Sequence, residues 1–323
     1  MSTSFRIIDA ATIQRLAPPE RLIEWMREAM VAVSRREVEL PLRQALVLPD
    51  GMGAVGMMPG YVGGGINAAG VKLVSLVPPE RRKGSSHLGL MVLYDADGLL
   101  PVAVLCGATV TSIRTSAVTA VATDALARKD ARVLAVLGAG EQGEAHVRAL
   151  RHVRQFDEVR VWDIRAEAAQ GLAERQGCRA ATSVEEAVTG ADVICTVTAA
   201  REPILPGSLI APGTHVNLIG SSFPDARETD DDLVAKSRFF VDYKPSTMAQ
   251  AGEFLHAIKS GRVSEDHIQG EIGAVVEGRI AGRTADADIT VYKSLGVAAQ
   301  DIVTAHRVNA LAELEQAGML AQV

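Results

Sequence analysis

The chain has 323 residues, of which 48% are hydrophobic and 22% charged, and its formal charge at pH 7 is −6. This composition is typical of a globular protein and excludes a disordered chain, a collagen-like chain and a coiled-coil rod. At about 150 residues per domain, the length favours two domains, with one large domain as the alternative. No basic stripe is present in the sequence, so we do not expect a nucleic-acid partner.

The sequence predicts neither a disulfide framework nor a metal site. The three cysteines, Cys106, Cys178 and Cys195, are far apart and odd in number, which is typical of thiols in a reducing compartment. The seven histidines show no metal-ligand spacing, and we expect His146 and His152 at the surface. The first residues lack the pattern of a signal peptide, and no apolar run reaches the roughly 18 residues of a membrane span. We therefore expect a cytoplasmic protein without a membrane partner.

The first third of the chain changes from a helical pattern to a pattern of strands. Residues 1 to about 37 are expected to be mainly helical, because apolar residues recur at helical spacing from Leu22 to Val33. Short apolar runs from 40 to 105 alternate with turn residues, which predicts an antiparallel sheet of hairpins with a polar loop at 78–88. Residues 111–129 predict a helix rich in small residues.

The remainder of the chain alternates between strands and helices. Apolar strands are expected at 131–138, 159–163, 191–198, 214–220 and 238–243. The predicted fold class is therefore α/β, with a Rossmann-type doubly wound parallel sheet and a mainly antiparallel α+β domain. The last helix, about 294–316, has no predicted strand after it and should pack on the first domain. We place the first domain at 1–115 with about 300–323, and the second at 116–299.

A glycine-rich turn follows the strand at 131–138. Gly138, Gly140 and Gly143 form the pattern GxGxxG, with a buried strand before it and a helix that starts inside it. In this context Gly138 permits a tight turn, Gly140 permits close approach of a pyrophosphate, and Gly143 permits close packing of helix on strand. The phosphates of a dinucleotide would lie at the helix N-terminus, where free N–H groups point.

An acidic residue ends the next predicted strand. Asp163 lies 20 residues after Gly143, at the place where a carboxylate accepts hydrogen bonds from the ribose hydroxyls of NAD. The alternative is an aspartate that only caps a turn. Arg165 would pair with the 2′-phosphate of NADP or stack on adenine, and a solvated surface charge is its alternative. NAD(H) is favoured, and NADP(H) remains the alternative cofactor.

Three basic residues of the first domain need an explanation. Lys72 lies in an apolar strand on the face of Val74 and Leu76, and its alternative is an edge-strand lysine that faces water. Arg43 lies in another predicted strand, where an exposed face would account for it. Arg114 is predicted near a helix start, where its charge opposes the helix dipole. This position favours contact with an anion, either a substrate carboxylate or a cofactor phosphate.

Eight motifs, all in family order, make the chain resemble the ornithine cyclodeaminase/mu-crystallin family over nearly its whole length. They are LRQALVLP, GMMPGY, GVKLVSLVP, TSIRTSAVTAVAT, VLGAGEQGEAHVRAL, VWDIR, GSSFPDARETD and DITVYKSLGVAAQD, of which the last two are specific. The resemblance implies an antiparallel domain for substrate binding and dimerisation, and an NAD(P)-binding Rossmann domain. It also implies a homodimer and hydride transfer between a nicotinamide and the α-carbon of an amino or imino acid.

The resemblance also implies roles for single residues. Arg43, Lys72 and Arg114 match residues that bind the substrate carboxylate, and Lys72 is the catalytic candidate because it could hold a water or help to supply the proton. Cofactor positions are matched by Arg114, Thr115, Gly140, Glu141, Gln142, Asp163 and Arg165, in addition to Gly138 and Gly143 of the glycine-rich turn. Ser294 and Leu295 match residues near the nicotinamide.

One departure from the family pattern separates the activities within it. Cyclodeaminases and the alanine dehydrogenase carry Asp two residues before the proline that corresponds to Pro224, whereas this chain has Ser222, as the mu-crystallin-like reductases do. A serine hydroxyl can orient a substrate but cannot act as a base at neutral pH without a partner. We therefore expect NAD(P)H-dependent reduction of a cyclic ketimine, Δ1-pyrroline-2-carboxylate or also Δ1-piperideine-2-carboxylate, to L-proline or L-pipecolate. The alternatives are an ornithine cyclodeaminase with bound NAD and a non-catalytic, crystallin-like nucleotide-binding protein.

Overall fold

The structure, a computed structural model, describes residues 4–77 and 88–322 and divides into two compact units. The first unit comprises Met1–Thr115 and Gly296–Val323, and the second comprises Ser116–Leu295. Each unit is built on one eight-stranded sheet. Of the polar loop predicted at 78–88, only Leu88 lies within the described residues.

The sheet of the first unit is mainly antiparallel, as predicted. Its strand order is β16-β1-β7-β6-β5-β4-β2, and β3 also pairs with β4. Only β1 and β7 among these neighbours run parallel. The strands are β1 (Ser4–Ile8), β2 (Val38–Glu39), β3 (Gln44–Leu48), β4 (Gly53–Val62), β5 (Ala68–Leu76), β6 (Leu88–Asp95), β7 (Pro101–Cys106) and β16 (Met319–Gln322).

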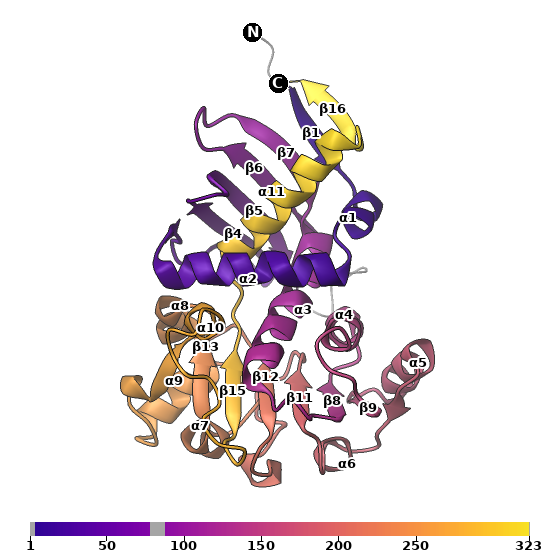
Figure 1. Cartoon of the computed structure of the whole chain (residues 1–323), viewed down its shortest axis with the longest axis vertical. Helices are drawn as coiled ribbons and strands as arrows, with labels where there is room; N and C mark the ends of the chain where they lie inside the picture. Colours follow the sequence, from indigo (N-terminus) through magenta and orange to yellow (C-terminus); the bar gives the residue numbers. More distant parts are fainter. Residues whose placement is uncertain (1–3, 78–87, 323) are drawn as a thin grey trace. The chain divides into compact units, whose positions relative to one another are not determined.

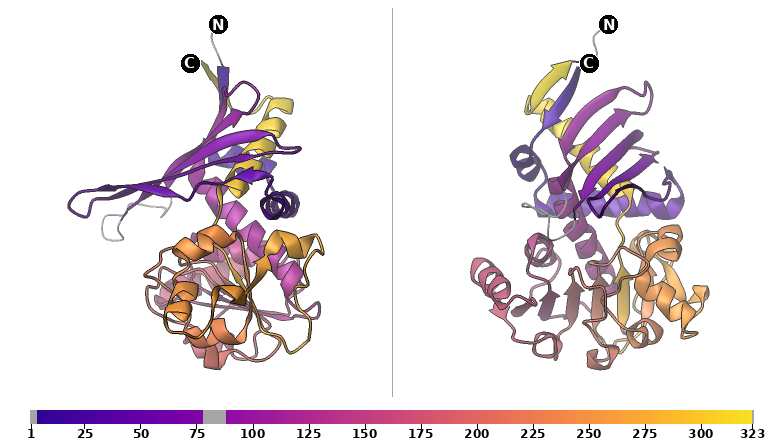
Figure 2. Two further views of the ribbon diagram at one scale, coloured as in Figure 1. Left: turned by 90° about the vertical axis from the view of Figure 1, so that its left-hand side faces the viewer. Right: turned by 180° about the vertical axis from the view of Figure 1, so that it is seen from behind.

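Among residues 4–77 and 88–322, three helices belong wholly to the first unit. They are α1 (Ala10–Leu16), α2 (Pro19–Arg35) and α11 (Ala298–Leu314). Asp9 caps α1 by accepting a hydrogen bond from the Thr12 N–H at 2.9 Å, and Pro19 opens α2, where its missing N–H costs nothing. Helix α11 packs against α2 and across β4 and β5, and both helices lie on the same side of the sheet (Figure 2).

Two strands at the ends of the chain contradict the sequence prediction. Residues 4–8 form β1, although this region was expected to be mainly helical, and β16 follows α11, although no strand was expected there. Neither strand has a distinct local pattern, and Met319 and Leu320 are largely exposed. Pairing with distant segments fixes both strands, because β1 lies between β7 and β16.

The second unit contains an entirely parallel sheet, which confirms the predicted α/β class (Figure 1). Strands β10-β9-β8-β11-β12 follow the usual Rossmann order, and β15-β13-β14 continue the sheet. The strands are β8 (Val133–Leu137), β9 (Glu158–Trp162), β10 (Arg179–Ala180), β11 (Val193–Thr196), β12 (His215–Leu218), β13 (Arg238–Val241), β14 (Ile268–Glu271) and β15 (Thr290–Lys293). The helices are α4 (Glu141–Leu150), α5 (Ala166–Gln176), α6 (Val184–Val188), α7 (Asp231–Lys236), α8 (Lys244–Gln250), α9 (Gly252–Lys259) and α10 (Ile272–Val276).

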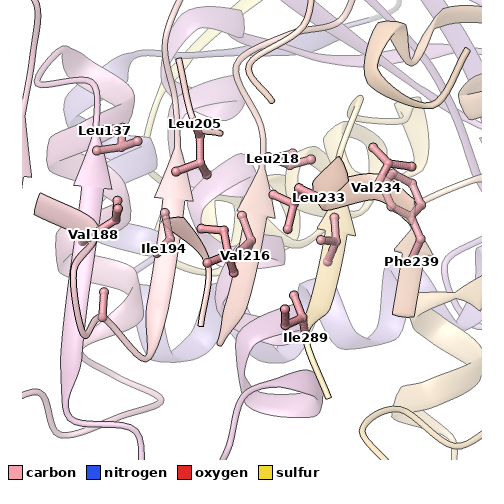
Figure 3. Packing of buried hydrophobic residues seen from close by; sticks show 14 of the residues in the cluster. Leu137, Val188, Ile194, Leu205, Val216, Leu218, Leu233, Val234, Phe239 and Ile289 are labelled. Carbon is pink, nitrogen blue, oxygen red and sulfur yellow. The ribbon is translucent and has the colours of Figure 1, made fainter. Parts of the chain in front are cut away.

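The core of the second unit explains why its strands form nearly continuous apolar runs. Leu137 of β8, Ile194 of β11 and Val216 of β12 come from strands that are neighbours in the sheet, and all three are fully buried (Figure 3). They belong to one cluster with Leu233 of α7 and Phe239 of β13. Parallel strands are covered on both faces, so few of their positions can be polar.

The boundary between the units falls inside a single helix. Helix α3 (Gly107–Leu126) begins directly after β7, earlier than the predicted start at residue 111, and the two units meet between its residues Thr115 and Ser116. Small residues fill its first turns, so the sequence shows no clear start. This earlier start changes the interpretation of Arg114.

Candidate active site

The glycine-rich turn joins β8 to α4 at the carboxyl end of the strand. Gly138 has a φ of +113°, which a residue with a side chain rarely adopts, and its N–H donates to the Trp162 carbonyl at 2.7 Å. A Cβ at Gly143 would collide with the Gly138 carbonyl oxygen, and a Cβ at Gly140 would have no atom within 4 Å. Gly140 is the N-cap of α4 and offers no side chain to that helix end. The turn therefore fits the pyrophosphate of a dinucleotide.

The first turn of α4 carries Glu141, which is exposed, and Gln142, which is half-buried. The Gln142 carbonyl lies 2.7 Å from Nδ1 of His146, and Nε2 of this histidine lies 3.1 Å from the Thr119 hydroxyl. His146 is fully buried, so its predicted surface position is wrong. Burial lowers the pKa of His146 to about 4, and the ring is neutral at pH 7. His152 is exposed, as expected.

Asp163 follows β9 and fixes the glycine-rich turn. One carboxylate oxygen accepts the Ala139 N–H at 2.8 Å, and the other accepts the Arg165 N–H at 2.9 Å and Nε at 3.4 Å. The side chain of Asp163 is 11% exposed and that of Arg165 is 65% exposed. Asp163 therefore caps a turn, and it also borders the proposed pyrophosphate site. A carboxylate has about four acceptor positions, so it can bind ribose hydroxyls in addition.

The loop after β12 carries Ser222, which is half-buried. The preceding Ser221 is buried, and its carbonyl accepts a hydrogen bond from the Lys293 ammonium at 2.6 Å. Asp225 is exposed and forms an ion pair with Arg201, so it belongs to a surface turn. The buried Lys293 thus fixes the backbone of the loop that presents Ser222.

A buried carboxylate that contacts this loop, Glu228, was not identified from the sequence. Glu228 is fully buried and accepts hydrogen bonds from the Thr196 hydroxyl at 2.7 Å, the Thr198 N–H at 2.8 Å and the Gly220 N–H at 2.8 Å. Burial raises the pKa of Glu228, whereas the charge of Lys293 acts in the opposite direction. Glu228 thereby ties the ends of β11 and β12 together. Its place in the motif GSSFPDARETD was the only available signal.

The segment after β15 carries Ser294 and Leu295, which are both buried. The Leu295 N–H donates to a carboxylate oxygen of Asp242 at 2.7 Å, and the Ser294 hydroxyl lies 3.4 Å from the same oxygen. Asp242 follows β13 and is fully buried. It therefore fixes the end of β15 within the second unit.

Lys72 lies on β5, between β4 and β6, and is only 3% exposed. The alternative of an edge-strand lysine that faces water is therefore wrong. Its ammonium lies 3.0 Å from one carboxylate oxygen of Asp301 and 2.9 Å from the other. Asp301 is a fully buried residue of α11. The structure thus gives Lys72 a counter-ion that the sequence analysis did not assign, although Asp301 ends the motif DITVYKSLGVAAQD.

Arg114 binds the same carboxylate. Its Nε donates to Asp301 at 3.0 Å and its Nη1 donates to the Gln300 side chain at 2.7 Å. Helix α3 begins at Gly107, so Arg114 lies about two turns into the helix. The helix dipole acts mainly on charges in the first turn, and Arg114 lies beyond that turn. The dipole argument for an anion contact is therefore wrong, and Asp301 accounts for the charge. The next residue, Thr115, donates its hydroxyl hydrogen to the Thr111 carbonyl at 2.6 Å.

Arg43 precedes β3 and lies outside the strands, contrary to the prediction. It is half-buried, and Nη2 donates to the Gly296 carbonyl at 3.0 Å. Gly296 has a φ of +73°, and a Cβ there would lie 2.6 Å from Nη1 of Arg114. The short segment 296–301 therefore contacts Arg43, Lys72 and Arg114. We call these three side chains, with Asp301, the basic cluster.

The charges of the basic cluster favour a further anion. Burial lowers the pKa of Lys72 to about 8, the charges of Arg114 and Arg43 act in the same direction, and Asp301 opposes them. Burial alone would raise the pKa of Asp301, but Arg114 and Lys72 bring it below its usual value. At pH 7 the two cations Lys72 and Arg114 thus share one carboxylate. A substrate carboxylate would complement the excess positive charge.

The predicted site residues fall into two groups. Arg43, Lys72 and Arg114 gather in the first unit, whereas the glycine-rich turn, Asp163 and Ser222 belong to the second. Across residues 4–77 and 88–322, no group of three or more histidine, cysteine or acidic side chains is placed to hold a metal ion. Within the same ranges, no helix combines the length and the apolar character needed to cross a membrane.

Comparison with known proteins gives matches over nearly the whole chain. The model of the ornithine cyclodeaminase/mu-crystallin family matches residues 6–314. The ketimine reductase mu-crystallin of Rattus norvegicus is 38% identical over 268 residues, which are 82% of this chain and 82% of that protein.

Two solved structures have a similar fold. The Δ1-pyrroline-2-carboxylate reductase of Thermococcus litoralis, in complex with NADH and L-proline, has a TM-score of 0.93 and 31% identity, and the match covers 98% of this chain and 99% of that one. An archaeal alanine dehydrogenase dimer with bound NAD has a TM-score of 0.91 and 28% identity, and the match covers 99% of each chain.

Proposed function

The chain belongs to the ornithine cyclodeaminase/mu-crystallin family, and we propose that it is an NADH-dependent reductase of a cyclic ketimine. The proposed substrate is Δ1-pyrroline-2-carboxylate, with Δ1-piperideine-2-carboxylate as a second, and the products are L-proline and L-pipecolate. The observation that carries the proposal is the basic cluster, since a pure nucleotide binder has no need of two buried cations on one carboxylate with a third cation, Arg43, bound to the same segment. We assign substrate binding to the first unit and the dinucleotide to the second.

The basic cluster would bind and orient the substrate carboxylate. Arginine guanidinium groups bind carboxylates with paired hydrogen bonds, and the buried ammonium of Lys72 adds a third donor. Such contacts fix one face of a small ring, and correct orientation alone can supply a large part of a rate enhancement. Holding the substrate by its carboxylate is therefore the main contribution of the first unit.

The reduction needs little acid–base chemistry. In a protonated cyclic imine C2 is already electrophilic; hydride adds to C2, and the electrons of the C=N bond become the lone pair of the amine nitrogen. NADH, when bound, supplies the hydride. Because the pKa of Lys72 lies at about 8, its ammonium can donate a hydrogen bond or a proton to the nitrogen near neutral pH. Lys72 is accordingly our candidate for the catalytic residue.

The second unit supports NAD(H) as the cofactor. The open N-terminus of α4 fits the pyrophosphate, and Asp163 places a carboxylate beside the turn, where it would bind ribose hydroxyls and repel a 2′-phosphate. Arg165 is held by Asp163, but its largely exposed side chain could pair with a 2′-phosphate. NADP(H) is therefore proposed as a weaker alternative cofactor.

We also propose that the chain forms a homodimer through the sheet of the first unit. Lys72 points to the side of the sheet that α11 covers, so Leu73 points to the opposite side, together with its neighbour Leu90. Leu90 is 50% exposed, and Leu46 of β3 is 59% exposed. Exposed apolar sheet faces of this kind mark interaction surfaces, and a second copy of the chain is the proposed occupant.

One comparison of activities tests the proposed function. Purified protein is mixed with NADH and Δ1-pyrroline-2-carboxylate, and separately with NAD and L-ornithine. NADH oxidation with the imine, and almost no ammonia from ornithine, is expected for the reductase. Ammonia release that matches or exceeds imine reduction would identify a cyclodeaminase, and tight nucleotide binding with neither activity would identify a binding protein.

A variant of Ser222 tests the distinction at a single residue. The Ser222 hydroxyl can donate or accept a hydrogen bond but cannot take up a proton at pH 7 without a partner base. Ser222→Asp introduces a charge in this loop, and we expect it to depress imine reduction or to shift the pH profile of the reduction. Full deaminase activity is not expected, because the amine of ornithine needs a pocket of its own. Unchanged reduction at every pH would remove Ser222 from the site.

A further inference from the structure

The segment 296–301, which leads into α11 and includes its first residues, contacts every basic side chain of the cluster. Gly296 accepts a hydrogen bond from Arg43, and Gln300 accepts one from Arg114. Asp301 pairs with both Arg114 and Lys72. We propose that the segment 296–301 is the positioning element of the carboxylate site, with Asp301 as the residue that holds Lys72 and Arg114 side by side. The inference rests on the proposed function, because it assigns what organises the proposed substrate site.

The geometry explains how two cations can lie together inside the unit. Lys72 comes from β5 and Arg114 from α3, and the exposed fractions of both side chains are near zero. A buried cation is costly unless it is paired, and two adjacent cations repel each other. Asp301 is also fully buried and lies within 3.0 Å of Lys72 Nζ and of Arg114 Nε. One carboxylate on α11 therefore determines where both cations point.

Asp301 leaves donors for a second carboxylate. A guanidinium has five N–H groups and an ammonium has three. Arg114 uses Nε on Asp301 and one Nη1 hydrogen on Gln300, so other Nη hydrogens remain available within the described contacts. Asp301 acts on the reaction through Lys72 and Arg114, and it is a positioning residue rather than a catalytic one.

Gly296 has a separate part in this arrangement. A Cβ at this position would lie 2.6 Å from Nη1 and 2.8 Å from Nη2 of Arg114, so only glycine leaves the guanidinium where it is. Its carbonyl also fixes Arg43 at 3.0 Å. Asp301 thus sets the charge and direction of two cations, and Gly296 sets the place of the guanidinium groups. Substitutions at the two residues should therefore have different effects on binding.

Removal of the Asp301 charge should change the titration of Lys72. The charged groups that face this ammonium are Asp301 from α11, Arg114 from α3 and Arg43 from the segment before β3. Only Asp301 favours the protonated form among them. Without its charge, the pKa of Lys72 should fall below its present value of about 8. An opposite charge within about 4–6 Å typically changes a pKa by one unit or more.

The experiment measures the binding of a stable carboxylate. Pyrrole-2-carboxylate, which stays charged across the neutral range, is titrated into NADH-loaded protein by calorimetry between pH 6 and 9. We expect Asp301→Asn to lower the pH at which binding is half lost by about one unit or more. Asp301→Glu keeps the charge and should retain a midpoint near that of the wild type. Glu28→Gln is the matched control, because it also removes a carboxylate that pairs with a cation of α11, Arg307.

A second variant keeps the inference testable if Asp301→Asn does not fold. Gly296→Ala removes no charge, so it should weaken binding of the probe roughly 10-fold or more at every pH. The midpoint of the pH profile should not move. An unchanged midpoint in Asp301→Asn, or unchanged affinity in Gly296→Ala, would overturn the assignment of that residue.

The experiment distinguishes a failure of this inference from a failure of the proposed function. If the wild type binds pyrrole-2-carboxylate but reduces no cyclic imine, the proposed reaction is wrong and the effects of the variants on binding still decide the inference. If NADH-loaded wild type binds no pyrrole-2-carboxylate, the basic cluster is not a carboxylate site and the inference is overturned as well. A midpoint shift that is present in Asp301→Asn and absent in Asp301→Glu supports the inference.

Discussion

Lys72 is the residue whose charge should set the pH dependence of the reaction. Its pKa is lowered to about 8, first by burial and then by Arg114. If the ammonium is the active form, kcat/KM is fully present below this pKa and falls as the pH rises through about 8. Lys72→Arg keeps the charge to a much higher pH, so the fall should disappear from its profile even though turnover is lower. A profile of Lys72→Arg that still falls near pH 8 would assign the titration to another group.

Lys72 should also affect turnover without affecting the affinity for the nucleotide. Lys72→Ala removes one charged contact to the substrate, which is worth about 1.5–3 kcal/mol, or roughly 10- to 150-fold in kcat/KM. NADH affinity, measured by fluorescence titration, should stay near the wild-type value, because Lys72 belongs to the first unit and the glycine-rich turn to the second. Wild-type kinetics in this variant would show that Lys72 is structural only.

Asp163 should decide between the two cofactors. Asp163→Ser removes a carboxylate that would bind the ribose hydroxyls and repel a 2′-phosphate. We expect NADH to bind roughly 10-fold or more weakly, and the ratio of NADPH to NADH affinity to rise. Arg165, freed from its carboxylate partner, would add to this change. Asp225→Ser is the control, because Asp225 is an exposed residue of the same unit that pairs with Arg201. An equal loss for both nucleotides would indicate that Asp163 only supports the turn.

The loop between β12 and α7 depends on a buried ion pair. Lys293 of β15 lies 3.1 Å from Glu253 of α9, both are fully buried, and the lysine also holds the Ser221 carbonyl. Removal of one partner leaves an unpaired buried charge, so Lys293→Met should lower the free energy of unfolding by about 3–5 kcal/mol in denaturant titrations. The double variant Lys293→Met, Glu253→Gln should lose less free energy of unfolding than Lys293→Met alone, because it leaves neither charge unpaired. A larger loss in the double variant would mean that the unpaired charge is not the cause of the destabilisation.

Elements with a strong local pattern could be predicted, and those fixed by pairing could not. The apolar strand before GxGxxG and the helix at Pro19 carry their own signals, so β8 and α2 were placed correctly. Strands β1 and β16 are defined by pairing between the two ends of the chain, and local periodicity contains no such information. The start of α3 was missed because small residues follow directly from β7.

The same limit applies to the candidate site. Lys72 could be singled out because a charge in an apolar strand is visible in the sequence, whereas Arg114 was singled out by a helix-dipole argument that the earlier start of α3 removes. Their partner Asp301 lies 229 positions from Lys72 and 187 from Arg114. Nothing in a single sequence links residues at that distance. The sequence could therefore draw attention to the two cations, but it could not predict the carboxylate that holds them together.

At the scale of the whole molecule, the first unit is not a continuous piece of chain. It takes Asp301 and β16 from the C-terminal segment, Gly296–Val323. Its sheet is covered on one side by α2 and α11, while the other side carries half-exposed leucines. Removal of such apolar surface from water stabilises an association by about 25 cal/mol per Å² of buried area. This imbalance between the two sides is the physical basis for the proposed dimer.

The dimer can be tested by sedimentation. The wild type is expected at twice the mass of the chain at micromolar concentration. Leu46 is 59% exposed and, by strand register, lies on the side of Met57 and Leu73, away from α11. Because a two-fold interface contains each residue twice, Leu46→Glu would bury two charges at once and should give monomers. Leu314→Glu, at the exposed end of α11, is the control and should remain dimeric. A wild-type protein that sediments as a single chain would refute the proposal, and a Leu46→Glu variant that stays dimeric would place the interface elsewhere.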